Sequence, residues 1–132
     1  MKIVEIDRNT DIRQSIIDHM NALGWQCASL LGGLGSARNI TLRNPGDSHI
    51  PPTLLKKTIS GPVEVISFTG HVEYGLQHPI FTRDNWYFHV HIGVANRKGR
   101  VSGGGFESAI VHISFRMFFE QAELSSPNNE VT

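Results

Sequence analysis

The stretch FHVHIGVANRKGRVSGGG, Phe88–Gly105, predicts a β-hairpin made of an alternating strand, a basic turn and a glycine run. Successive side chains on a strand point to opposite faces. One face is therefore apolar and belongs to the core: Trp86, Phe88, Val90, Ile92 and Val94. The other face carries Tyr87, His89, His91, Gly93 and Ala95. The turn NRKG over 96–99 then brings the glycine run beside the two histidines, in a register open by a residue or two.

His89 and His91 are the leading candidates for a binding site. At this spacing their Cα atoms lie about 6.5–7 Å apart on one face, so both imidazoles can reach one ion. Catalytic zinc usually has three protein ligands, and His71 and His112 are candidates for the third. Alternatively, the pair consists of hydrogen-bonded residues in a half-buried sheet face or a subunit contact. The glycines would form a pocket floor, a bulge or a close backbone contact: Gly103, Gly104 and Gly105.

The rest of the chain predicts an α+β fold with a mostly antiparallel sheet and one main helix packed on it. The helix is expected to be capped by Asn9 or Thr10, to carry Asp11 in its first turn and to end at Gly24. Strands are expected over 2–6, 25–31, 40–44, 54–59, 62–70, 86–95 and 108–120, with a glycine-rich bend between strands over 32–39. We expect a single domain over 1–120 and a mobile C-terminal tail over 121–132.

Composition limits the classes of function. The 132 residues include 12 basic and 12 acidic side chains, a neutral balance that argues against autonomous, high-affinity DNA binding. The densest basic cluster lies at the predicted turn and is a possible phosphate contact: Arg97, Lys98 and Arg100. Cys27, the only cysteine, is expected to be a small buried residue. Glu64, Glu73 and Glu107 are dispersed, so no acid–base pair is evident and the sequence favours a non-enzymatic role. Without a signal peptide or a membrane-length apolar run, we expect a cytoplasmic protein.

Four segments, in order, resemble the PPC domain shared by plants and prokaryotes. They are TDIRQSIIDHMNALGW, ASLLGGLGSARNITLRNP, GPVEVISFTGHV and FHVHIGVANRKGRVSGGGF, and the resemblance extends over roughly residues 3 to 120. It implies a mainly antiparallel sheet with a helix against it, and a homotrimer. Plant relatives hold DNA through an AT-hook, and this chain contains no such motif.

The resemblance also implies a metal site. Many prokaryotic members read Gly-Gly-His where this chain has Gly103, Gly104 and Gly105. In some relatives that histidine and the pair matching His89 and His91 resemble a three-imidazole site. The implied site for zinc or another divalent transition metal is therefore incomplete at Gly105.

Three functions remain open from the sequence. The first is a DNA-binding or regulatory trimeric module, the role that the family resemblance implies. The second is a metal- or small-ligand-binding protein, with enzymatic activity open, that uses the His89/His91 face. The third is a structural protein-interaction module.

Overall fold

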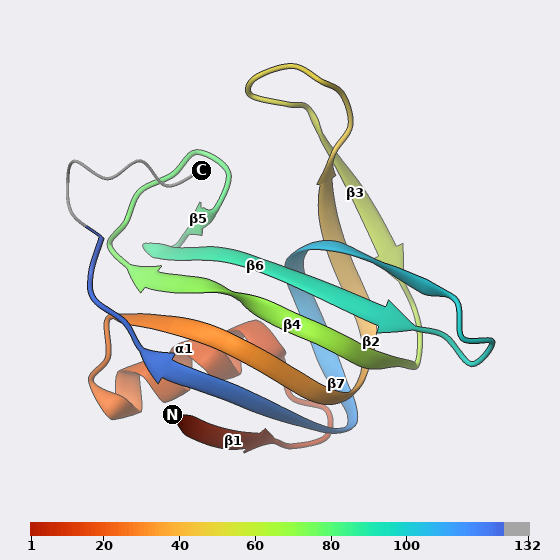
Figure 1. The fold of residues 1–132 in the computed structure, drawn as a ribbon, viewed down its shortest axis with the longest axis horizontal. Helices are drawn as coiled ribbons and strands as arrows, with labels where there is room; N and C mark the ends of the chain where they lie inside the picture. Colours follow the sequence, from red (N-terminus) through yellow and green to blue (C-terminus); the bar gives the residue numbers. More distant parts are fainter. Residues whose placement is uncertain (126–132) are drawn as a thin grey trace.

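The computed structural model describes residues 1–125 and confirms the α+β class, with a mostly antiparallel sheet and a single short helix. In chain order the elements are β1 (Lys2–Ile6), α1 (Ile12–Leu23), β2 (Cys27–Pro45), β3 (Leu54–Ile59), β4 (Val63–Tyr74), β5 (Thr82–Arg83), β6 (Trp86–Ala95) and β7 (Val101–Gln121). Figure 1 shows β2 and β3 continuing beyond the other strands as a long two-stranded arm.

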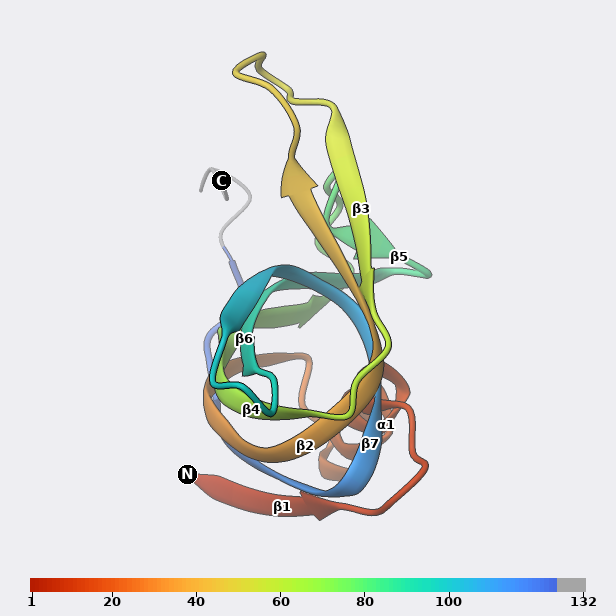
Figure 2. The ribbon, with the colours of Figure 1, turned by 90° about the vertical axis from the view of Figure 1, so that its right-hand side faces the viewer.

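The sheet closes on itself. The strands follow the order β1-β7-β2-β4-β6-β5, and β6 pairs with β7 as well, so that β7, β2, β4 and β6 form a ring (Figure 2). Every pairing between these strands is antiparallel. β3 pairs with β2 outside the ring and has exposed lysines, as the sequence predicts for an edge strand. Closure leaves fewer free edges than an open sheet would have.

The predicted bend between two strands over 32–39 is wrong, because β2 runs without a break from Cys27 to Pro45. Its register against β7 shifts four times between Leu30 and Leu42. Bulges of this kind bend and twist a strand without ending it, which lets β2 curve around the ring. At Gly35, φ is 142° and a Cβ would collide with the Ser114 carbonyl oxygen, so this close approach of β7 requires glycine.

The inside of the ring forms the core. Phe68 is fully buried, and its ring packs edge-to-face against Phe106 and Phe115 at 5.2 Å between centroids. The predicted core face of β6 is confirmed, since each of its five members is at most 6% exposed: Trp86, Phe88, Val90, Ile92 and Val94. Tyr87, on the opposite face, is fully buried as well. This second burial comes from the loop before β6, whose Phe81 ring lies 5.7 Å from the Tyr87 ring.

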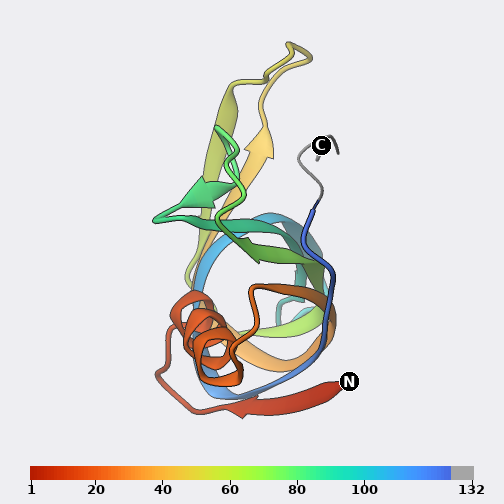
Figure 3. The same ribbon diagram turned by 90° about the vertical axis from the view of Figure 1, so that its left-hand side faces the viewer.

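Helix α1 lies outside the ring against β7 (Figure 3) and buries Ile12, Ile16 and Met20. The predicted cap is wrong: Asp11 is the N-cap, and its carboxylate accepts a hydrogen bond from the Gln14 N–H at 2.9 Å. A residue with extended backbone angles and a short acceptor side chain suits this position. The predicted end is confirmed, because Gly24 caps the helix at φ 69°.

The β6–β7 hairpin forms where the sequence predicts it. The Asn96 carboxamide oxygen accepts hydrogen bonds from the Lys98 and Arg100 N–H groups, and Gly99 has a φ of 76°. At the other end of β7, the Ala122 N–H donates to the Cys27 carbonyl at 3.0 Å, so the first residues after this strand contact β2. The remainder of the predicted tail, 126–132, lies outside the described residues.

Candidate functional site

The two histidines of β6 lie on one face, as predicted, with ring centroids 5.2 Å apart. The glycine run lies beside β6 within the register that the sequence leaves open, with Gly105 paired to His91. Along its other edge β6 pairs with β4, which places His71 beside His89. His89 is half-buried, and its Nδ1 lies 3.3 Å from the Tyr87 hydroxyl. Burial lowers the pKa of His89, and the neighbouring His91 lowers it further, so the ring is neutral near pH 7.

Of the two candidate third ligands, His71 lies directly across from His89 on β4. The Nε2 of His71 faces Glu73 at 3.0 Å and Cys27 at 3.7 Å. His112 lies on β7, seven residues beyond Gly105. Among residues 1–125, one group of three or more side chains could hold a metal ion, and it consists of Cys27, His71 and Glu73 without His89 or His91. Metal binding by the histidine pair therefore stays a prediction.

The glycine run allows strands to approach closely. A Cβ at Gly103 would collide with the Ile92 carbonyl oxygen of β6, and one at Gly105 with the Arg43 carbonyl oxygen of β2. Asn44 spans the run, since its amide donates to the Gly103 carbonyl and its oxygen accepts from the Gly105 N–H. Gly105 alone of the three glycines lines the neighbouring cavity. A histidine at position 105 would require β2 to move.

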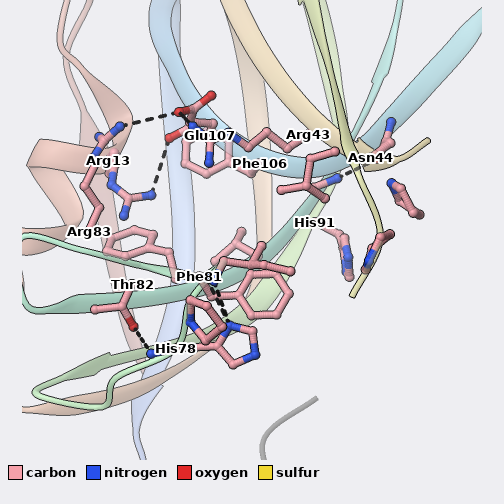
Figure 4. A pocket seen from close by; sticks show the side chains of 18 of the residues that line it. Arg13, Arg43, Asn44, His78, Phe81, Thr82, Arg83, His91, Phe106 and Glu107 are labelled. Atoms are coloured by element: carbon pink, nitrogen blue, oxygen red, sulfur yellow. Dashed lines mark hydrogen bonds and ion pairs between the residues drawn. The ribbon is translucent and has the colours of Figure 1, made fainter. Parts of the chain in front are cut away.

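That cavity has a volume of about 670 Å³ and lies between the β2–β3 arm, the loop before β6 and the start of β7 (Figure 4). His91 lies on its wall. A volume of 300–1,000 Å³ is typical of small-molecule sites. Much of the wall is apolar and comes from four separate parts of the chain: Ile50, Leu54, Phe81, Phe88, Val90 and Phe106.

One end of the cavity carries three arginines around one carboxylate (Figure 4). Arg43 Nη2 lies 2.7 Å from Glu107 Oε1, and Arg83 Nη1 lies 3.7 Å from the same oxygen. Arg13, which is buried, donates to the Glu107 backbone carbonyl at 3.5 Å and places its guanidinium 4.0 Å above the Phe88 ring. Lys56 approaches Glu107 Oε2 at 3.9 Å, but within residues 1–125 that buried oxygen accepts no hydrogen bond.

Positive charge is in excess at this end. Of the Asp, Glu, Lys and Arg side chains lining the cavity, three are arginines and one is Glu107, which leaves a formal charge of +2. Burial lowers the pKa of Arg13 to about 10, and the charge of Arg83 adds to the effect. Arg13 is still cationic at neutral pH. A buried cation whose neighbours include two further cations is stabilised by a bound anion.

The loop before β6 holds the apolar wall against the histidine strand. The Phe81 ring stacks between His89, at a centroid distance of 4.1 Å, and His78, at 4.6 Å. His78 Nδ1 accepts the backbone N–H groups of Ile80 and Phe81, which fixes the turn that carries the ring. The cavity, the loop and His91 therefore form one continuous site.

Sequence reasoning missed most of this site. Arg13, Arg43, Arg83 and Glu107 are far apart in the chain, and Glu107 is one of the dispersed glutamates in the sequence. The signal that could have found it is the pairing of the glycine run with the histidine strand, which carries Glu107 past His91. The predicted basic cluster lies elsewhere, exposed at the tip of the β6–β7 hairpin: Arg97, Lys98 and Arg100.

The model of the Plants and Prokaryotes Conserved (PCC) domain matches residues 1–120. The chain belongs to this family. The resemblance to the PPC domain, another abbreviation of the same name, is thereby confirmed.

Solved PPC-like structures share the fold. A PPC protein from Pyrococcus horikoshii has a TM-score of 0.74 and 17% identity, covering 93% of this chain and 79% of that one. A "putative DNA binding protein" from Bacteroides thetaiotaomicron has a TM-score of 0.70 and 23% identity, with coverages of 87% and 75%. A metal-containing protein from Archaeoglobus fulgidus has a TM-score of 0.68 and 21% identity, with coverages of 91% and 79%.

Comparison with curated proteins gives no significant match. Among the residues that the structure describes, the PPC domain has no helix of the length and apolarity needed to cross a membrane.

Proposed function

We propose that this PPC domain is a binding module for a small organic anion with an apolar body. The observation that carries the proposal is the group of three arginines around Glu107 at one end of an apolar cavity. Arginine presents several N–H donors in a planar fork that fits a carboxylate or phosphate. Glu107 neutralises one positive charge, so the remaining charge of the group is available to a ligand.

The rest of the cavity wall indicates the chemistry of the ligand's uncharged part. Phe81, Phe88 and Phe106 offer an apolar wall to a ring or a branched chain, and burial of that part adds about 25 cal/mol per Å². His91 lies on the same wall, where its ring nitrogens can hydrogen-bond to a second polar group. An aromatic carboxylate fits these surroundings better than inorganic phosphate does.

Calorimetric titration of the full chain with benzoate, phenylacetate, acetate and phosphate at constant ionic strength tests the proposal. We expect saturable binding, with the aromatic carboxylates tighter than acetate or phosphate. Arg83→Gln should weaken binding about tenfold or more, since a hydrogen bond to a charged group contributes about 1.5–3 kcal/mol. Arg116→Gln is the matched control, because Arg116 pairs with Glu5 on an exposed surface. Equal affinity in both variants, or no saturable binding, would refute the proposal.

A second candidate function is DNA association. The names of two solved neighbours, at 23% and 15% identity, include DNA binding. In this chain the exposed hairpin tip offers three cations to phosphate: Arg97, Lys98 and Arg100. Gel shifts at about 50 mM salt, with these three residues changed to Gln as the comparison, test this role. Retardation that the triple variant loses would support it, and no retardation at that salt would exclude it.

Self-association as a homotrimer belongs to the same proposal. Leu34, Ile66 and Ile113 are each more than half exposed, at 57%, 51% and 69%. They come from three neighbouring strands around Ser36, whose hydroxyl accepts the Ile113 N–H at 3.0 Å. Exposed apolar residues that adjoin in this way are typical of a subunit contact. We expect light scattering to give the mass of three chains, and Ile66→Glu to give one.

A further inference from the structure

A second cluster of chemically active side chains lies away from the arginine cavity. Cys27 of β2 pairs directly with Glu73 of β4, and His71 precedes Glu73 by two residues on the same strand. Alternation along β4 places His71 and Glu73 on one face, and the pairing adds Cys27 to that face. None of the three is among the residues that line the arginine cavity.

The three ligand atoms converge on one point. Cys27 Sγ lies 3.4 Å from Glu73 Oε1 and 3.7 Å from His71 Nε2, and Nε2 lies 3.0 Å from Oε1. A tetrahedral zinc ion with bonds of about 2.0–2.3 Å holds its ligand atoms about 3.3–3.6 Å apart. The sides of the observed triangle, 3.0, 3.4 and 3.7 Å, lie within about 0.3 Å of these values, so small side-chain shifts bring the three atoms onto one face of a zinc tetrahedron.

The same geometry excludes a thiol-based catalytic relay. In such a relay one imidazole nitrogen faces the thiol and the other faces the carboxylate. Here Nε2 of His71 faces both Cys27 and Glu73. Burial also raises the pKa of the Cys27 thiol to about 12, and the hydrogen bond to Glu73 adds to this rise, so the metal-free sulfur is no nucleophile at neutral pH.

We infer that Cys27, His71 and Glu73 form a zinc site with three protein ligands. A thiolate and an imidazole favour zinc over magnesium or calcium, which prefer oxygen ligands. Charge balance agrees, because a thiolate and a carboxylate together neutralise a divalent ion in a place where Cys27 and Glu73 are at most 4% exposed. Binding releases the thiol proton to solvent as the Zn–S bond forms.

We expect the fourth coordination position to face a cavity beside Cys27. Cys27 lines a cavity of about 510 Å³ together with residues 121–124, at the point where β7 ends. Ser125 follows these residues, and its N–H and hydroxyl donate to Glu73 Oε1 at 3.1 and 2.9 Å, which orients the carboxylate. Three protein ligands with one accessible position are typical of a zinc ion that also binds water or a small ligand.

Titration of the full, reduced chain with cobalt(II), a spectroscopic substitute for zinc, tests this inference. Because Cys27 is the only cysteine, any thiolate-to-cobalt charge-transfer band must arise from it. We expect this band to saturate at about one equivalent, together with the intense visible bands of tetrahedral cobalt, and zinc to displace the cobalt. Wild-type protein without a thiolate band would overturn the inference, and this readout needs no variant.

Variants then separate this site from the predicted histidine pair. Cys27→Ser should remove the charge-transfer band, and Glu73→Gln should weaken cobalt binding by about 100-fold or more, beyond the 10–100-fold typical of residues that only orient a ligand. The double variant His89→Gln/His91→Gln is the matched control and should keep both the band and the affinity. Loss of cobalt binding in this control, with retention in Cys27→Ser, would assign the metal to the histidine pair and overturn the inference.

Discussion

Glu107→Gln should tighten the binding of organic anions to the arginine cavity. The substitution keeps the shape of the side chain and removes the one negative charge among the arginines, so the formal charge of the group rises from +2 to +3. An anion seated at Arg43 or Arg83 would lie about 6 Å from the Glu107 carboxylate. At an effective dielectric constant of about 20, their repulsion is roughly 3 kcal/mol.

Part of this repulsion is lost to solvent. The side chains of Arg43 and Arg83 are 43% and 53% exposed, so water and salt screen the ligand's charge. Taking half of the Coulomb value leaves about 1.4 kcal/mol, which corresponds to a tenfold gain in affinity. Arg43→Gln changes the charge in the opposite direction and should weaken binding by a similar factor.

Isothermal titration calorimetry with benzoate, at two salt concentrations, measures both effects. The Glu5–Arg116 pair provides matched controls, because Glu5→Gln and Arg116→Gln make the same chemical changes on an exposed surface. Both controls should bind benzoate as the wild type does. If Glu107→Gln and Arg43→Gln both weaken binding, Glu107 serves to organise the arginines or to contact the ligand, and the charge argument is refuted.

Three further predictions concern the fold that carries the site. Gly105→Ala should lower the free energy of unfolding by about 1–3 kcal/mol, because the new Cβ collides with the Arg43 backbone. Gly32→Ala is the control and should change it little, because the nearest atom to its Cβ lies at 3.8 Å. Urea denaturation measures both variants. Phe68→Ala should cost about 3–5 kcal/mol in the same assay, and a loss below 1 kcal/mol would contradict the closed core. Asp11→Ala should cost about 1 kcal/mol through the lost helix cap, and Thr10→Ala much less; equal losses would contradict the observed cap.

The strands and their faces were predictable because side-chain burial alternates along a strand, whatever the order in which the strands pair. The core face of β6 and the hairpin around Asn96 therefore follow from the sequence alone. The prediction of a bend between two strands over 32–39 was wrong because glycine is common both in turns and in β-bulges. Only the pairing of the segment with a neighbouring strand distinguishes a bulge from a turn. β7 supplies that partner along most of β2, so the chain stays extended.

The candidate site depends on contacts that periodicity does not encode. Arg13 and the Glu107 carbonyl are 94 positions apart in the chain, and they meet because α1 packs on β7. The two registers of the histidine strand also depend on its partners: β7 places Gly105 beside His91, and β4 places His71, whose Nε2 faces Cys27, beside His89. One sequence offers no signal for either event.

The neutral composition hides a local separation of charge. Twelve basic and twelve acidic residues balance over the chain, yet the cavity wall keeps an excess of two positive charges. A neutral net charge thus argues against strong DNA binding, which engages many phosphates over a wide surface. It does not argue against a cavity that binds one anion. The two candidate functions consequently differ in salt dependence. Raising salt from 50 to 200 mM should abolish binding that rests on several phosphate contacts, whereas a partly buried anion is screened much less.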